Sequence, residues 1–255
     1  MKKIALIIVL LLSFNKSVYC QNEAEETAKL SSLIAAYEHN DLVTLDEVID
    51  SGVNLNAVLH AASLRKYSPL VKKLLESGAD PNSKIKTGET ILISSIINDA
   101  NEETIKLLID AGANVNQPIT TGLTPLMFSS SHHTPSQLKI MKLLINAGAE
   151  LDVQDKQGYS AIKYAVHSNS YNSNKRVKLL LDSGANINLQ DNEGKTVLMV
   201  AIENHNIEMV KLLIAYGIDI NVKDNSEWTA LRYALDGKNK EIISLIKAAK
   251  GSLGN

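Results

Sequence analysis

The residues with the greatest capacity for chemistry in this chain are six histidines and a recurring set of aspartates. His132 and His133 are adjacent, and neighbouring side chains rarely point at one metal ion. No Cys or carboxylate nearby completes a zinc site around them. A weak hydrolase that used His132, His133 and Asp155 as acid–base groups remains a rival interpretation. A double alanine variant of the two histidines that kept its full activity would exclude this interpretation.

The aspartates share one position in a repeated unit: they are Asp155, Asp191 and Asp224. Paired carboxylates can act as a general acid and base, but a residue that recurs once per unit is typical of a turn. The chain contains no Gly-x-Ser-x-Gly elbow, phosphate-binding loop, His-Glu-x-x-His motif or dinucleotide fingerprint. We therefore expect no enzyme activity, and no catalytic, cofactor or metal site.

Composition narrows the class of protein further. The net charge of -2 over 255 residues is too small for a protein that binds nucleic acid through a basic surface. The single cysteine, Cys20, excludes an internal disulfide and a cysteine-rich metal site. Aromatic residues make up only 4% of the chain, which is low for a β-sandwich or barrel.

The first 20 residues have the three-part pattern of a secretory signal peptide, with two lysines, an apolar run (4–12) and a polar stretch. The apolar run is shorter than the roughly 20 residues that span a bilayer, so we expect no membrane span. Cleavage after Cys20 is expected. Acylation of Cys20 is the alternative, although Tyr19 and Ser17 fit a lipoprotein signal poorly. Residues 21–28 form an acidic linker, and the cleaved chain would carry a charge of -5.

The rest of the chain repeats a two-part motif. In one part, an aliphatic pair precedes a Gly, a small residue and Asp or Asn. Its copies are VIDSGVNLN (48–56), LLESGADPN (74–82), LLIDAGANVN (107–116), LLINAGAELD (143–152), LLLDSGANIN (179–188) and LLIAYGIDIN (212–221). The other part reads GETILISSI (88–96), GLTPLMFSS (122–130), GYSAIKYAV (158–166), GKTVLMVAI (194–202) and EWTALRYAL (227–235). The last of these copies has lost its glycine.

This combination resembles the ankyrin repeat family over residues 29–250. The resemblance implies an all-α solenoid of about seven helix–turn–helix repeats including caps, joined by short hairpin fingers, with a flexible tail at 251–255. One helix pair cannot bury its own apolar face, so the pairs must stack. Thr or Ser at positions 90, 124, 160, 196 and 229 is expected to cap each first helix. The glycines of the aliphatic motif are expected to end each second helix: Gly52, Gly78, Gly112, Gly148, Gly184 and Gly217.

The resemblance also assigns roles to individual polar residues. His60 matches the histidine of the family's Thr-Pro-Leu-His motif, where the imidazole bonds backbone between repeats. His39, His167 and His205 fall near inter-helix turns, where polar residues are normally solvated.

In this family the contact surface consists of finger tips and the exposed positions of the first helices. The finger residues just before the capping position are Glu89, Leu123, Tyr159, Lys195 and Trp228. The variable first-helix positions are Asn98, His132, His167, Ser168, Glu203, Asn204 and Asp236. Large apolar residues that need not be buried are typical of binding hot spots, and three fingers carry Leu, Tyr or Trp. The alternative is that each packs on a neighbouring finger.

We therefore predict a monomeric, non-catalytic protein that binds another protein in the bacterial envelope or outside the cell. It could act as a scaffold or protective partner of an envelope protein. The alternatives are an inhibitor or immunity protein of a periplasmic toxin or enzyme, and a secreted effector directed at a host.

Overall fold

The computed structural model describes residues 28–29, 31–32, 34–36, 47–85, 87–131, 134, 136–168 and 172–252. The expected signal peptide with Cys20 lies outside these residues, as do the acidic linker apart from Ala28, His39 and the adjacent His132 and His133. Among the residues described, no helix is both long enough and apolar enough to cross a membrane.

The chain divides into two compact units, residues 1–58 and 59–255. In the first unit, residues 28–29, 31–32, 34–36 and 47–50 are helical, and Lys29 donates a hydrogen bond to the carbonyl of Ser51 at 3.4 Å. The helical segment that ends near Gly52 is followed by a left-handed turn, since Gly52 has a φ of 80°. These features agree with the first predicted helix pair as far as it is described.

The second unit consists of paired helices, the first of which, α4, crosses the boundary between the two units. The first helices of the pairs are α4 (Leu55–Leu64), α6 (Ile91–Ile97), α8 (Pro125–Ser131), α10 (Ala161–His167), α12 (Val197–Glu203) and α14 (Ala230–Asp236). The second helices are α5 (Ser68–Glu76), α7 (Glu102–Asp110), α9 (Gln137–Asn146), α11 (Ser173–Asp182), α13 (Ile207–Ala215) and α15 (Lys240–Ser252). The all-α prediction is confirmed. Helix α15 continues two residues past the expected end of the array.

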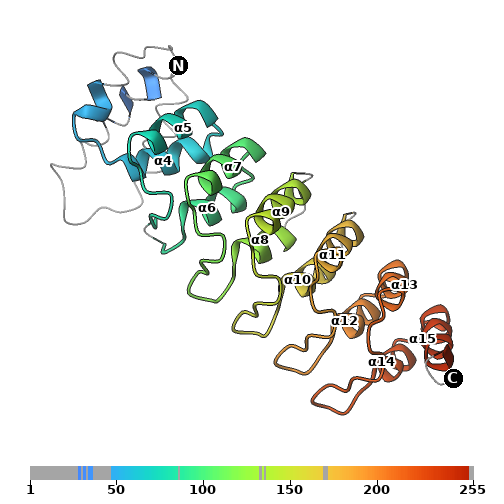
Figure 1. Ribbon diagram of the computed structural model, residues 1–255. Coiled ribbons are helices and arrows are strands. Elements are labelled where there is room, and N and C mark those ends of the chain that lie inside the picture. The colour runs from blue at the N-terminus through green and yellow to red at the C-terminus, as the bar shows by residue number, and fades with distance from the viewer. Residues whose placement is uncertain are drawn as a thin grey trace. The chain divides into compact units, whose positions relative to one another are not determined.

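The pairs stack in chain order within this unit (Figure 1). From α6 onward each first helix packs against the next first helix, and from α5 onward each second helix packs against the next second helix. The connecting fingers leave the second unit on one side, beside the first helices (Figure 1). Residues at equivalent finger positions therefore lie in a row along the first-helix side.

Burial explains why such short helices are stable. Helix α12 has seven residues, and residues 197–202 are all buried, so almost none of its side chains is exposed to solvent. Helix α9 is amphipathic and buries Ile140, Met141 and Leu144 while its other face stays accessible. Isolated helices of this length are marginal in water, so stacking rather than helix propensity holds them.

The predicted caps are only partly present. The hydroxyls of Thr90 and Thr124 accept hydrogen bonds from the amides of Ile93 and Met127, each at 3.3 Å. The prediction is wrong for three other first helices, whose N-cap residues make no side-chain cap bond: they are Ser160, Thr196 and Thr229. Their backbone is more extended, with ψ of 166–171° against 159° at Thr90. Packing must therefore fix the start of these helices.

The glycines behave as predicted. All six glycines of the aliphatic motif adopt a positive φ, between 77° and 97°, at the end of a second helix. In the finger that lost its glycine, Glu227 takes the left-handed conformation instead, with φ of 63°. Such a φ is uncommon for a residue other than glycine, so the finger geometry overrides the local preference of this residue.

Candidate protein-binding surface

Three fingers are each built around one buried aspartate. The Oδ1 atom of Asp155 accepts hydrogen bonds from the amides of Gln157, at 2.9 Å, and Tyr159, at 2.8 Å. Asp191 and Asp224 make the same pair of bonds to residues two and four positions later. The prediction that these residues form turns is confirmed. The bonds also fix the backbone of the finger residues that the sequence predicted as contacts: Tyr159, Lys195 and Trp228.

The second carboxylate oxygen of each aspartate has a different kind of partner. Tyr164 donates its hydroxyl proton to Asp155, and Tyr233 donates to Asp224, both at 2.5 Å. Each tyrosine lies nine residues after its aspartate, on the following first helix. The sequence analysis missed this pairing, although the equal spacing was a usable signal.

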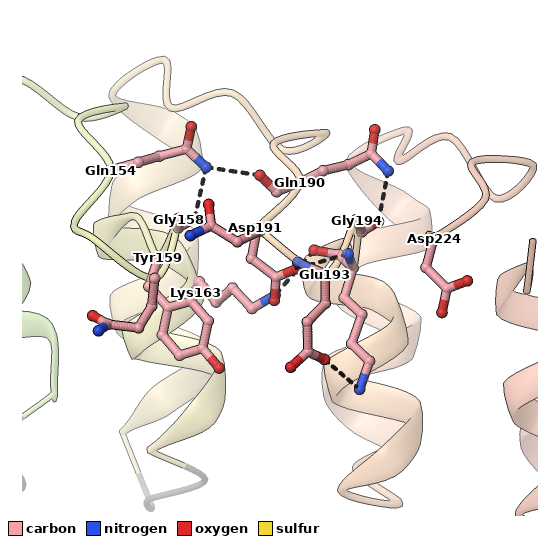
Figure 2. Close-up of polar contacts among 12 residues, drawn as sticks. Gln154, Gly158, Tyr159, Lys163, Gln190, Asp191, Glu193, Gly194 and Asp224 are labelled. Carbon is pink, nitrogen blue, oxygen red and sulfur yellow. Dashed lines mark hydrogen bonds and ion pairs between the residues drawn. The ribbon is translucent and has the colours of Figure 1, made fainter. Parts of the chain in front are cut away.

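The middle finger lacks this tyrosine, because Val200 occupies the position nine residues after Asp191. Lys163 of helix α10, in the preceding repeat, forms an ion pair with Asp191 instead (Figure 2). Its Nζ atom also donates to the carbonyl of Lys195 at 2.9 Å. Both charged side chains are only 3% exposed. The equivalent positions in the neighbouring first helices hold Met127 and Met199.

Burial and these bonds shift the acidity of the groups involved. Burial, followed by the hydrogen bond to the aspartate, raises the pKa of Tyr164 and of Tyr233. Burial tends to raise the pKa of Asp224, but the bonds from Tyr233 and from the amides of Trp228 and Ser226 outweigh it, and the pKa is lowered. Burial lowers the pKa of Lys163, and the bond to Asp191 opposes this.

Side-chain amides connect adjacent fingers (Figure 2). The Nε2 atom of Gln154 donates to the carbonyl of Gly158 at 2.6 Å and to that of Gln190, in the next finger, at 2.7 Å. Gln190 repeats the pattern, with bonds to the carbonyls of Gly194 and Lys223 at 2.6 and 2.9 Å. A Cβ atom added at Gly158 would lie 2.6 Å from the amide nitrogen of Asn192. The fingers therefore form one connected layer.

Two aromatic clusters lie beside this layer of fingers. The ring of Tyr159 stacks on His167, with centroids 5.7 Å apart, and meets the ring of Tyr164 edge-on at the same distance. Trp228 meets Tyr233 edge-on at 5.3 Å. We call these five residues together the aromatic ridge: Tyr159, Tyr164, His167, Trp228 and Tyr233.

Lys195 and its acidic partners lie between the two clusters. The Nζ atom of Lys195 is 3.0 Å from Glu203 and 3.3 Å from Glu193. It also lies 5.6 Å from the ring centroid of Tyr233. These contacts raise the pKa of Lys195 against the opposing effect of burial. A charged group therefore packs against the cluster of Trp228 and Tyr233.

The structure thus brings five of the sequence-predicted contact residues together in two groups. Tyr159 stacks on His167. Lys195, which pairs with Glu203, and Trp228 both contact Tyr233. Glu89 and Leu123 belong to earlier fingers, in which Ile85 and Ile119 replace the aspartate, and the described contacts do not join them to the aromatic ridge. Asp236 is exposed at the end of α14. The other predicted first-helix positions that are described make local contacts: Asn98 donates to the carbonyl of Ser94, Ser168 to that of Ala165, and Asn204 ends α12.

Two other described histidines, His60 and His205, lie at structural positions. The Nε2 atom of His60 lies 2.8 Å from the hydroxyl of Ser94, in the next repeat. The expected bond to backbone is therefore wrong, because the neighbouring helix places a side-chain hydroxyl at that point. Burial lowers the pKa of His60. His205 adopts a φ of 51° in an inter-helix turn. Within the described part of the chain, no three His, Cys, Asp or Glu side chains gather in a way that could hold a metal ion.

Comparison with known proteins agrees with the stacked architecture. A family model described as ankyrin repeats (3 copies) matches residues 59–155, 120–191 and 162–252. These matches span most of the chain and include the fingers that carry the aromatic ridge. None of the curated proteins compared with the chain matches it.

Proposed function

Because this chain belongs to the ankyrin repeat family, we propose that it is a non-catalytic protein that binds a protein partner through the aromatic ridge. Ankyrin repeats generally mediate protein–protein interactions, and only ankyrin repeats were found in the chain. The observation that carries the proposal is the placement of half-buried Tyr159 and Trp228 at finger positions that buried aspartates hold in a fixed geometry.

The aromatic ridge suits binding for two physical reasons. Tyrosine and tryptophan supply large contact areas and are enriched among the residues that dominate binding energy. The hydrogen-bonded finger layer holds them in place before a partner arrives, so that little side-chain ordering remains to oppose association. The ion pairs of Lys195 with Glu193 and Glu203 add polar groups between the two apolar clusters.

We further propose that the protein acts after export, in the bacterial envelope or outside the cell. This rests on the signal-like pattern of residues 1–20. Mass spectrometry of the amino terminus after cell fractionation tests it. A chain that begins at Gln21 supports export and cleavage, a lipid-modified Cys20 supports an anchored protein, and an intact Met1 contradicts export.

Substitution of the aromatic ridge tests the binding proposal. After a partner is identified by cross-linking to the full chain, we expect Tyr159→Ala and Trp228→Ala each to weaken its affinity by roughly 2 kcal/mol, or about 30-fold. Titration calorimetry measures the affinity, and circular dichroism reports whether the helices are intact.

Tyr216→Ala is the matched control. Tyr216 ends a second helix, where its hydroxyl donates to Asp182 at 2.6 Å, so it is an aromatic residue outside the fingers and first helices. Its replacement should leave the affinity unchanged. A loss of helicity in Tyr159→Ala and Trp228→Ala would show that these residues belong to the core, and unchanged affinity in both would contradict the proposal.

A further inference from the structure

The aromatic residues of the fingers are paired with cations in a regular way. Arg232 lies over the ring of Trp228, four residues earlier, with 5.0 Å between the guanidinium carbon and the ring centroid. Lys163 lies over Tyr159, also four residues earlier, at 5.0 Å. The negative face of an aromatic ring attracts a cation at such distances. Both finger aromatics therefore have a cation from their own repeat.

The tyrosines of the first helices differ from each other in this respect. Lys195, in the finger of the preceding repeat, supplies a cation to the ring of Tyr233. The residue equivalent to Lys195 in the finger before Tyr164 is Leu123, since both directly precede the N-cap position of a first helix. Leucine has no charge to offer. Among the described residues, Tyr164 thus has the same bond to a buried aspartate as Tyr233 but no cation from the preceding finger.

The surroundings of Tyr164 favour a positive charge. Its hydroxyl donates to the buried carboxylate of Asp155, which makes no ion pair within the described part of the chain. The carboxylates near the adjacent Tyr159 act in the same direction. Burial raises the pKa of Tyr159, and the carboxylates of Asp191 and Glu193 raise it further, against the effect of Lys195. The ring of Tyr159 meets Tyr164 edge-on, and His167 stacks on Tyr159 in turn.

We propose that the ring of Tyr164, beside Tyr159, binds a cationic side chain, arginine or lysine, of the protein partner. The partner supplies at Tyr164 the cation that Lys195 supplies within the chain at Tyr233. This inference rests on the proposed function, because it names the chemistry that the same surface recognises. It also assigns Leu123 as the residue that leaves the site open.

Model peptides test the recognition without a known partner. The probes are the capped pentapeptide Gly-Ser-Arg-Gly-Ser and the same peptide with neutral citrulline in place of arginine. We expect the arginine peptide to shift the ring resonances of Tyr164 in the NMR spectrum of the full chain, with an affinity about tenfold above that of the citrulline peptide. Equal affinity of the two peptides would overturn the inference.

Leu123→Lys is the decisive variant. It places an ammonium group where Lys195 sits in the later repeat, so the chain fills its own site, and we expect affinity for the arginine peptide to fall about fivefold or more. Leu123→Met is the control, because it keeps an apolar side chain of similar size, and it should bind as the unmodified chain does. Unchanged binding by a folded Leu123→Lys variant contradicts the inference. If that variant does not fold, the comparison of the two peptides on the unmodified chain decides.

The outcomes separate this inference from the proposed function. If Trp228→Ala weakens the partner's binding while the two peptides bind equally, the cation site is wrong and the binding function stands. If the arginine peptide binds at Tyr164 but neither Tyr159→Ala nor Trp228→Ala changes the partner's affinity, the proposal of binding through the aromatic ridge is wrong.

Discussion

The middle finger differs from its two neighbours in how it satisfies the same buried carboxylate. In the flanking fingers, a tyrosine of the same repeat donates to the aspartate: Tyr164 to Asp155 and Tyr233 to Asp224. In the middle finger, Lys163 reaches Asp191 from the preceding repeat. The backbone bonds of all three aspartates are the same. The buried carboxylate therefore accepts from a side chain of its own repeat in two fingers, and from a side chain of the preceding repeat in the third.

This difference shows how an array tolerates variation in its units. With Val200 in place of a tyrosine, Asp191 would keep one oxygen without a side-chain donor in a buried site. The preceding repeat supplies a charged donor, Lys163, at a position where the repeats on either side of it have methionine. Stability in a repeat array is a sum of contributions within repeats and between neighbours. In the middle finger, a contact between neighbouring repeats replaces the contact within one repeat. Helix α10 and this finger therefore depend on each other.

The largest effect is expected from Lys163→Met, which removes the donor and leaves the buried carboxylate of Asp191 without its counter-charge. Removing one member of a buried ion pair is strongly destabilising, and we expect the free energy of unfolding to fall by about 3 kcal/mol. Urea denaturation followed by circular dichroism measures it. Lys106→Met is the control, because Lys106 pairs with Asp110 on the surface, and the loss should stay below about 1 kcal/mol. Equal losses in the two variants would contradict the account.

A smaller effect is expected from Tyr164→Phe, which keeps the ring and removes the hydroxyl that donates to Asp155. A charged acceptor that loses one donor costs about 2 kcal/mol, and urea denaturation at pH 7 measures the loss. Tyr216→Phe, which removes an exposed bond to Asp182, should cost less. The opposite order would show that the bond to Asp155 is not important.

The same substitution carries a pH signature. The pKa of Tyr164 is raised in the folded state above its ordinary value of 10.0, so the stability that this group contributes is fully present below pH 10 and is lost as the pH rises above it. The free energy of unfolding should therefore fall less steeply above pH 10 in Tyr164→Phe than in the unmodified chain. Parallel pH profiles would argue against the bond.

The smallest effect is expected from Glu203→Gln. Glu203 shares Lys195 with Glu193, and the side chains of Glu203 and Lys195 are 40% and 24% exposed. Water and salt screen such a pair, so the loss of stability should stay below about 1 kcal/mol and shrink further at high salt. Urea denaturation at two salt concentrations measures both. A loss as large as that of Lys163→Met would contradict the contrast between the surface and buried ion pairs of the middle finger.

The repeat pattern was sufficient to predict the helix pairs, because periodic aliphatic residues and glycines with positive φ depend on local spacing. It also led to the finger positions of Tyr159 and Trp228. The partners of the aspartates were not predicted. Tyr164 and Tyr233 could have been found from their equal spacing, but Lys163 and Asp191 are 28 residues apart and meet only when two repeats stack. The prediction of cap bonds at Ser160, Thr196 and Thr229 was wrong, because packing fixes the start of those helices.

The central claim is that each of the three fingers with a buried aspartate needs one side-chain donor for it, from whichever repeat provides it. The double variant Lys163→Met with Val200→Tyr tests this most directly, because it gives the middle finger the arrangement of its neighbours. We expect its free energy of unfolding in urea to recover most of the roughly 3 kcal/mol lost in Lys163→Met alone. A double variant that is no more stable than Lys163→Met would contradict the claim.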